Sequence, residues 1–384
     1  MSLINYTKEQ LLFRDTVREF VAKELRPHAL EWEDAGHTPR KIWERCGELG
    51  LLGITYPAKY GGLDADYVMT LILAEEMSQC DSPGIGLGIS VQTDMATPAL
   101  AIHGSEELKT KYLAPAIKGE MICSIAVTEP GAGSDVAALT TKAVRDGDHY
   151  VINGAKTFIT NGTQADFLTL LARTSDAPGH RSFSLFVVPT NTPGFSVGKV
   201  LKKTCYPSSD TAEIVLEDVR VPVGNVIGEE NKGFIYQMQQ FQLERLVGSF
   251  SMLGGMKRCY ELTKQYIQER EVFGGKLGSF QVTQHKMAQM ISEITVVEAL
   301  AHMCVKKVME AADFTKEASM LKLIAAQTQQ RVTEECVQMH GGYGLMAEYP
   351  ISRYFRDSKL AGIGGGSNEI MKEIICKYEG LSSW

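Results

Sequence analysis

One glutamate in a helical stretch is a candidate catalytic base. Glu244 stands in the segment QLERLV, and on a helix Phe241 and Val247 lie three residues to either side of it. Apolar neighbours raise the pKa of a carboxyl group by desolvation, and the removal of a weakly acidic proton requires such a base. The alternative is a solvated glutamate beside Arg245, which the local pattern alone favours because charged side chains are rarely buried.

Two glycine-rich segments predict a close approach of the backbone to a ligand. The segment IGGGSNEI, residues 363–370, contains three consecutive glycines, and glycine serves where a backbone bends sharply or comes close to another group. The segment QMHGG, residues 338–342, precedes it, with Arg353 and Arg356 between the two. Helix-capping turns explain one of these runs. Both runs together, with two arginines between them, predict a backbone that follows a large anionic ligand.

A loop and a strand add small hydroxyls and an aromatic ring. The loop VTEPGAGSDVAAL, residues 127–139, can aim its N–H groups and the hydroxyls of Thr128 and Ser134 at a polar ligand, although a plain surface loop is the alternative. It matches neither the dinucleotide-binding GxGxxG pattern nor a P-loop. In KTFIT, Phe158 and Thr160 could flank a flat ring, and the alternative is a strand with one buried aromatic.

Three stretches of the chain with different secondary-structure patterns must position these segments. Residues 1–120 show helical patterns of apolar residues. Residues 121–232 show short β-branched runs separated by turn residues, and the pairs Asn153-Gly154 and Asn161-Gly162 predict hairpin turns. Residues 233–384 show long helical patterns with short breaks, which is typical of a bundle of antiparallel helices.

Composition excludes several classes of protein. The 384 residues, 44% hydrophobic and 22% charged, suit a globular protein of two or three domains. A net charge of -7 argues against a general nucleic-acid binder, and we expect no membrane span because no apolar run approaches the required length.

The eight cysteines are dispersed without a CxxC pair, and the eight histidines form no HxxxH. Free buried thiols and no metal site are therefore predicted. The N-terminus lacks the character of a signal or transit peptide.

Taken in order, these segments resemble the acyl-CoA dehydrogenase family over essentially the whole chain. Six groups of segments occur in the order and spacing typical of the family: TEPGAGSD, FITNG, EREVFG with FQVTQHKMA, QMHGGYG, EYPISRYFRD and GGGSNEI. The resemblance implies an α+β fold with an N-terminal all-α domain (1–120), a middle β-barrel or sandwich domain (121–232) and a C-terminal four-helix bundle (233–384). It also implies FAD, an acyl-CoA substrate, electron-transferring flavoprotein as electron acceptor, and a homotetramer built as a dimer of dimers.

The resemblance implies a reaction, the α,β-dehydrogenation of acyl-CoA thioesters to trans-2-enoyl-CoA. A carboxylate removes the α-proton and the β-hydrogen leaves as hydride to flavin N5, while hydrogen-bond donors polarise the thioester carbonyl. Most members carry the base in the last glycine-rich motif, where this chain has Gly365. The isovaleryl and long-chain branches lack an acid there and carry the base on the first bundle helix, in a sequence similar to LERL. The resemblance therefore implies that Glu244 is the catalytic base.

The resemblance also implies the residues that contact cofactor and substrate. Those for FAD are Ile125, Val127, Thr128, Gly133, Ser134, Phe158, Ile159, Thr160, Arg270, Phe273, Gln281, Gln338, Met339, Gly341, Gly342, Ser367, Asn368 and Glu369. Those for the substrate are Ser134, Arg245, Gly365 and Gly366. Among the first group, Arg270, Phe273 and Gln281 match positions that contact the adenosine diphosphate half, often from a neighbouring subunit. The main-chain N–H of Glu369 matches a donor to the thioester carbonyl.

A narrower resemblance concerns the acyl chain. The segments VQTDMATPALA, GSDVAALTTKA, SSDTAEIVLEDVRVP and IYQMQQFQLERL resemble the citronellyl-CoA dehydrogenase branch, which implies branched or medium to long acyl chains. Two alternatives remain: an acyl-CoA oxidase or flavin monooxygenase on the same fold, and a non-catalytic scaffold. The chain length and Glu244 favour the dehydrogenase, and the flavin motifs argue against the scaffold. The expected compartment is a bacterial cytoplasm or, for a mature form, the mitochondrial matrix.

Overall fold

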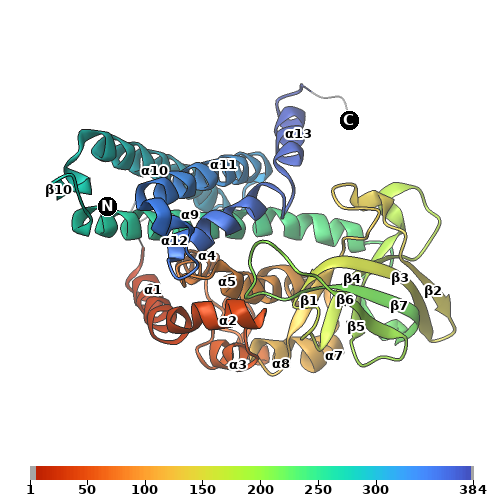
Figure 1. The fold of residues 1–384 in the computed structure, drawn as a ribbon. Coiled ribbons are helices and arrows are strands. Elements are labelled where there is room, and N and C mark those ends of the chain that lie inside the picture. The colour runs from red at the N-terminus through yellow and green to blue at the C-terminus, as the bar shows by residue number, and fades with distance from the viewer. Residues whose placement is uncertain (1–5, 382–384) are drawn as a thin grey trace.

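The computed structural model describes residues 6–381 and shows a helical part, a β part and a second helical part, in that order along the chain (Figure 1). The β part lies at one end of the molecule, beside the start of the longest helix, α9 (Gly233–Glu269). The α+β fold class predicted from the sequence is confirmed.

Short helices pack around one buried helix in the N-terminal part. These helices are α1 (Lys8–Phe20), α2 (Ala29–Ala35), α3 (Lys41–Glu48), α4 (Tyr67–Met77), α5 (Pro83–Ser90), α6 (Pro98–His103), α7 (Glu106–Leu108) and α8 (Ala114–Ile117). Nearly all of α4 is buried, because a helix with apolar side chains on every side must be packed on every side. Val68 and Leu71 of α4 share a core with Leu246 and Phe250 of α9. The buried helix α4 thus supports the helix that carries Glu244.

The middle part is one sheet of eight strands. The strands are β1 (Cys123–Ala126), β2 (Lys142–Asp146), β3 (His149–Thr160), β4 (Phe167–Arg173), β5 (Phe183–Pro189), β6 (Phe195–Val200), β7 (Thr211–Pro222) and β8 (Val226–Ile227). Their order is β6-β7-β3-β2-β4-β5-β8, and β1 pairs with β4. The strands β4 and β5 are almost wholly buried, which explains their uninterrupted apolar runs.

The predicted hairpin turn at Asn153-Gly154 is wrong. Both residues lie inside β3, where the register against β7 shifts between Ile152 and Gly154. A Cβ atom on Gly154 would lie 2.5 Å from the hydroxyl of Thr141, so glycine is required by this close approach. Asn161-Gly162 does form the turn that ends β3, but β3 pairs with β2 and β7 rather than with the next strand.

Three long helices form the C-terminal part. They are α9, α10 (Gln281–Met309) and α11 (Thr315–His340), and the shorter helices α12 (Pro350–Asp357) and α13 (Asn368–Tyr378) follow. The small hairpin β9 (Glu271–Val272) and β10 (Gly275–Lys276) joins α9 to α10. Side chains of α9, α10 and α11 share one core, and α13 packs against α11. In Figure 1 the hairpin stands at the end of the bundle opposite the β part.

The helix α10 meets the length and composition of a membrane-spanning helix, which corrects the expectation that no segment does so. One third of its most apolar window is buried, and the same test is passed by core helices of bundles. Two acids on α10 form ion pairs with the neighbouring helices: Glu293 with Arg331 at 2.5 Å and Glu298 with Lys257 at 2.6 Å. These pairs and the shared core give α10 the role of a bundle helix.

The eight cysteines are free, as the sequence predicts, and six of them are buried. Burial raises the pKa of the Cys304 and Cys336 thiols to about 12. Within residues 6–381 no three His, Cys, Asp or Glu side chains are grouped as a metal site.

Candidate active site

Glu244 is buried in the first third of α9. Its side chain is 7% exposed, so the alternative of a solvated glutamate is wrong. Burial raises the pKa of Glu244 to about 8, against the opposing effects of a hydrogen bond from Gln240 and the charge of Arg245. The Nε2 of Gln240 donates to Glu244 Oε1 at 2.8 Å. A carboxyl group in this position is a strong base once it has lost its proton.

A second buried carboxyl group, Asp94 of the N-terminal part, acts on Glu244 through its charge. Asp94 lies in η4 (Val91–Ala96), a π-helical turn between α5 and α6 that packs against α9. Its Oδ2 accepts hydrogen bonds from Ser90 Oγ at 2.9 Å and Thr93 Oγ1 at 2.7 Å. Burial raises the pKa of Asp94 to about 6, and the charge of Asp94 in turn raises the pKa of Glu244. Asp94 was not singled out from the sequence, because a single acid on a helical pattern is usually solvated.

The glycine run lies beside Arg245, the residue that follows Glu244. Gly365 and Gly366 have φ angles of +64° and +92°, which favour glycine. A Cβ atom on Gly366 would lie 3.9 Å from Arg245 Nε, whereas one on Gly365 would have no heavy atom within 4 Å. The structure therefore brings together the predicted substrate residues Arg245, Gly365 and Gly366. Open space remains at Gly365, the position at which the resemblance implies a catalytic acid in most members.

A buried lysine that sequence reasoning missed holds this run in place. Lys322 of α11 is 2% exposed and its Nζ donates to the carbonyl oxygen of Gly366. Burial and the nearby Arg245 lower the pKa of Lys322 to about 8. In the sequence, Lys322 is a lysine on the apolar face of a predicted helix. Such a lysine usually extends its charged group to solvent, so the pattern does not indicate burial.

The start of α13 follows the glycine run. Ser367 caps the helix, and its Oγ accepts from the N–H of Ile370 at 3.4 Å. Glu369 is exposed. In the described part of the chain, Asn368 Oδ1 and Arg245 Nε are buried without a hydrogen-bond partner. Buried polar atoms are normally satisfied, so both atoms are suited to a ligand that completes this site.

Phe158 stands at a bulge of β3. Its φ angle is +59° and its side chain is 68% exposed, so the alternative of a buried strand aromatic is wrong. The register of β3 against β7 shifts between Lys156 and Ile159, and this bulge turns the ring outward while Ile159 remains buried. An exposed aromatic ring held in a strained backbone conformation is typical of a binding site.

A buried ion pair joins this bulge to the glycine-rich loop. Lys156 Nζ donates to Glu129 Oε1 at 2.9 Å and to the carbonyl of Val127 at 3.0 Å. The N–H of Thr157 donates to the carbonyl of Thr128 at 2.9 Å. Although burial acts in the other direction, Lys156 and the donors around Glu129 hold the pKa of that carboxyl down to about 2. Sequence reasoning missed this pair.

The flavin residues predicted in the β part therefore adjoin one another. Ile125 of β1, Val127, Thr128 and Thr160 are half-buried, and Gly133 and Ser134 are exposed on the loop. The ion pair of Glu129 and Lys156 places this loop against the bulge that carries Phe158.

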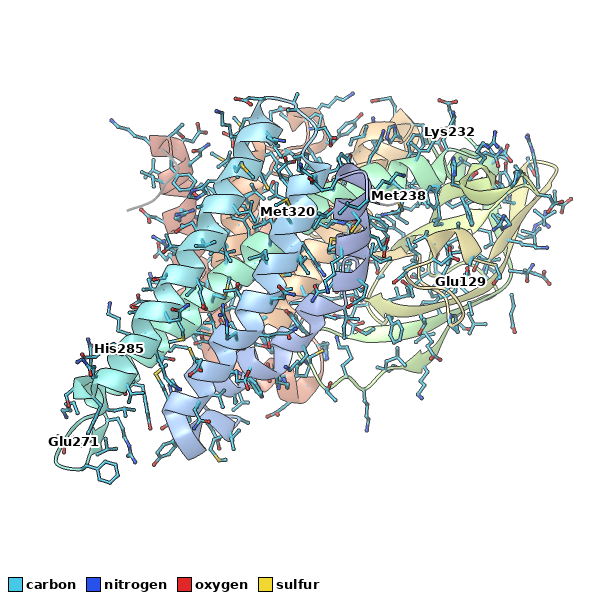
Figure 2. The ribbon with its side chains drawn as sticks, turned by 90° about the horizontal axis from the view of Figure 1, so that it is seen from above. Glu129, Lys232, Met238, Glu271, His285 and Met320 are labelled. Carbon is cyan, nitrogen blue, oxygen red and sulfur yellow. The ribbon has the colours of Figure 1, made fainter. Side chains whose placement is uncertain are left out.

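The remaining predicted cofactor residues lie elsewhere. Arg270, Met339, Gly341 and Gly342 line an open hollow of about 560 Å³ at the far end of the bundle. Exposed Gln338 adjoins Met339 on α11, Gln281 starts α10, and Phe273 is 99% exposed on the hairpin. Glu129 and Glu271, labelled in Figure 2, mark the β part and the hairpin and lie at opposite ends of the molecule. One chain does not bring these two groups of residues together.

Aromatic side chains line the hollow that Arg270 borders. Tyr266 stacks on His340 with ring centroids 4.3 Å apart, and Tyr343 lies 5.9 Å from the guanidinium of Arg270. His340 and Tyr343 belong to the segment QMHGGYG that the sequence singles out, whereas Tyr266 was missed because it is one aromatic in a helical pattern. A cation among flat rings suits a ligand that carries both phosphate and an aromatic base.

Comparison with known families decides what this fold is. The profile of the acyl-CoA dehydrogenase N-terminal domain matches residues 7–120, that of the middle domain matches 124–219, and that of the C-terminal domain matches 231–378. The chain belongs to the acyl-CoA dehydrogenase family. It is therefore an enzyme of the oxidoreductase class, in a family of FAD flavoproteins that dehydrogenate acyl-CoA thioesters.

Individual relatives agree with this assignment. The mitochondrial long-chain specific acyl-CoA dehydrogenase of Mus musculus is 39% identical over 97% of this chain and 86% of its own. The mitochondrial isovaleryl-CoA dehydrogenase of Pongo abelii is 36% identical over 96% and 88%. The solved acyl-CoA dehydrogenase of Geobacillus kaustophilus is 41% identical over 98% and 99%, with a TM-score of 0.94. A glutaryl-CoA dehydrogenase of Mycobacterium smegmatis, solved in complex with FADH2, is 29% identical over 99% and 96%, with a TM-score of 0.93.

The residues of this chain fit FAD. Phe158 presents an open aromatic face, and Cβ atoms on Gly131 and Gly133 would meet no heavy atom within 4 Å, so a ligand can approach this loop closely. At the start of α13, the unpartnered Asn368 Oδ1 offers an acceptor. At the far end of the bundle, Arg270 offers a cation to a pyrophosphate.

Proposed function

We propose that Glu244 is the base that removes the α-proton of an acyl-CoA thioester in an FAD-dependent α,β-dehydrogenation. The observation that carries the proposal is the burial of Glu244, whose chain neighbour Arg245 lies beside a glycine run that has no acid at position 365. Burial raises the proton affinity of the carboxylate, and the α-proton of a thioester is a weak acid that demands such a base.

The negative charge that develops on the thioester has donors and cations nearby. Arg245 and Lys322 both approach Gly366, and neither has a carboxylate salt-bridge partner within residues 6–381. The N–H of Glu369 belongs to the first turn of α13, where N–H groups have no intrahelical partner. Preorganised donors of this kind stabilise an enolate more than its neutral precursor.

Phe158 and the loop that carries Thr128 and Ser134 form one wall for the cofactor. FAD, when bound, supplies the acceptor for the β-hydrogen. The buried ion pair of Lys156 and Glu129 keeps this wall rigid, because breaking a buried pair leaves an uncompensated charge. We propose electron-transferring flavoprotein as the acceptor of the electrons.

A homotetramer built as a dimer of dimers explains the separation of the predicted cofactor residues. Arg270, Phe273 and Gln281 belong to the hairpin end of the bundle and Phe158 to the β part, and Glu271 and Glu129 mark these two opposite ends of the molecule in Figure 2. A second chain that places its hairpin end against the β part of the first would bring both groups to one FAD. Light scattering that finds a monomer with full flavin content contradicts this arrangement.

The open space at Gly365 supports a branched or medium to long acyl chain. A Cβ atom at this position would meet no heavy atom within 4 Å, so the substrate can approach the backbone closely here. A panel of straight and branched acyl-CoA thioesters, assayed under anaerobic conditions by the bleaching of the flavin band, identifies the preferred chain.

The same assay tests the base. We expect Glu244→Gln to retain FAD and to lose about 10²–10⁴-fold in the rate of bleaching. Near-full bleaching by this variant on the best substrate overturns the role of Glu244. Peroxide formation by the wild type in air, at the rate of substrate oxidation, would assign an oxidase instead.

A further inference from the structure

We infer that Gln240 is a positioning residue, which holds the carboxylate of Glu244 and ties it to the segment Met95–Ala99. The side chain of Gln240 is 5% exposed and lies one helical turn before Glu244 on the same face of α9. This inference rests on the proposed function, since it assigns the group that prepares the proposed base for its task.

The orientation of the Gln240 amide is fixed by a partner that can only donate. The backbone N–H of Ala99 lies 3.2 Å from Oε1 of Gln240, so the atom that faces Ala99 must be the oxygen. Because Ala99 is the second residue of α6, its N–H has no partner within the helix and needs one from outside. The amide nitrogen therefore points away from Ala99.

Both hydrogens of that nitrogen are then used. Nε2 of Gln240 donates to Glu244 Oε1 at 2.8 Å and to the carbonyl of Met95. A flipped amide would place an oxygen against the carboxylate and against a carbonyl oxygen, and three contacts would become repulsive. Gln240 has one satisfied orientation, and in that orientation it donates to the proposed base.

In setting the pKa of Glu244, this donation acts together with the charge of Arg245 and against burial and the charge of Asp94. Asp94, on η4, acts on Glu244 with a like charge, and Arg245, the next residue on α9, acts with an opposite charge. Tyr67, on α4, donates instead to the carbonyl of Leu243 at 3.3 Å. Among residues 6–381, Gln240 is the one hydrogen-bond donor to the Glu244 carboxylate. Its removal should therefore make the charged form of Glu244 harder to reach.

The chain offers a matched control one turn earlier. Gln237 is on the same helix, is fully buried, and has no hydrogen-bond partner for either amide atom within the described residues. Gln237→Leu and Gln240→Leu delete the same chemical group from the same helix at the same depth. Only the second deletes a donor to Glu244.

The experiment measures the pH dependence of kcat/KM, which reports the pKa of the free enzyme's base. For Gln240→Leu the acid limb of this pH profile, where kcat/KM rises with pH, should shift to higher pH by about one unit. A hydrogen bond to a charged group contributes a pKa shift on the order of this size. The loss at pH 7 should then be about 10-fold and should disappear at high pH. Gln237→Leu should leave the limb in place. Gln240→Glu, which keeps the volume but adds an acceptor, should move it further than Gln240→Leu.

Two outcomes overturn the inference. One is a loss for Gln240→Leu that is equal at all pH values, as a general loosening of the fold would produce. The other is an equal shift for Gln237→Leu. If Gln240→Leu does not fold, Gln240→Glu carries the same test. Glu244→Gln, measured in parallel, separates this inference from the proposed function, because an active Glu244→Gln refutes the base itself whatever Gln240 does.

Discussion

Burial of Glu244 should make the protein less stable as the pH rises, and Glu244→Gln should remove that cost. The pKa of Glu244 is raised to about 8, against 4.5 for the unperturbed group. Between these values the folded state binds more protons than the unfolded state, so stability falls with increasing pH. The contribution of Glu244 is fully present below pH 4.5 and is lost as the pH rises through about 8.

The magnitude follows from the two pKa values. Each pKa unit corresponds to about 1.4 kcal/mol, so between pH 5 and pH 8 the cost of ionising Glu244 grows by roughly 3 kcal/mol. Glutamine has nearly the same shape and its Oε1 accepts from Gln240 as the carboxylate does, so the variant keeps the packing. The stability of Glu244→Gln relative to wild type should therefore increase by roughly 3 kcal/mol over this pH range.

Urea denaturation of both proteins at pH 5 and pH 8 measures this difference. Glu107→Gln is the control, because Glu107 is exposed and its substitution tests the loss of a surface acid alone. A stability difference between wild type and Glu244→Gln that is the same at both pH values would refute the reasoning. Glu244 would then ionise in the folded protein as it does in water, and its burial would have no electrostatic cost.

Three further predictions follow from other parts of the site. Lys156→Met should destabilise the fold by about 3–5 kcal/mol by leaving Glu129 buried without its partner, as thermal or urea denaturation would show, whereas exposed Lys142→Met should cost little. Phe158→Ala should weaken FAD binding in a flavin titration with little change in stability, because the ring is mostly exposed; unchanged affinity would remove Phe158 from the site. The double variant Glu244→Gly, Gly365→Glu should regain part of the turnover lost in Glu244→Gly and favour shorter unbranched chains in the acyl-CoA panel, although the left-handed backbone at position 365 costs about 1–2 kcal/mol; no gain over Glu244→Gly would contradict it.

The order of the fold could be predicted because it depends on local patterns. Helical spacing in the first and last parts, and β-branched runs in the middle, are properties of short windows of sequence. Asn153-Gly154 shows where such windows fail. Glycine is required at position 154 because Thr141, on another stretch of the chain, lies too close for a side chain. No local sequence pattern distinguishes such a bulge from a turn.

The site was predicted less completely, for a related reason. Glu244 looked like a surface residue in its helix, and its burial depends on α4 and η4, which lie far from it in sequence. Lys322, Asp94 and Gln240 were not singled out from the sequence because the fold brings their partners to them. Motif resemblance supplied Glu244 and Gly365, whereas the side chains that support them required the three-dimensional arrangement.

The distance between the hairpin end and the β part has a genetic consequence. In the proposed assembly, each FAD site takes its base from one chain and the Arg270 end from another. A chain with Glu244→Gln and a chain with Arg270→Glu would each be inactive alone. In a mixed pair, one site would collect both defects while the other would receive an intact base and an intact Arg270. Two inactive alleles expressed in one cell would therefore complement each other, and a quantitative rescue assay could count the chains that build one site.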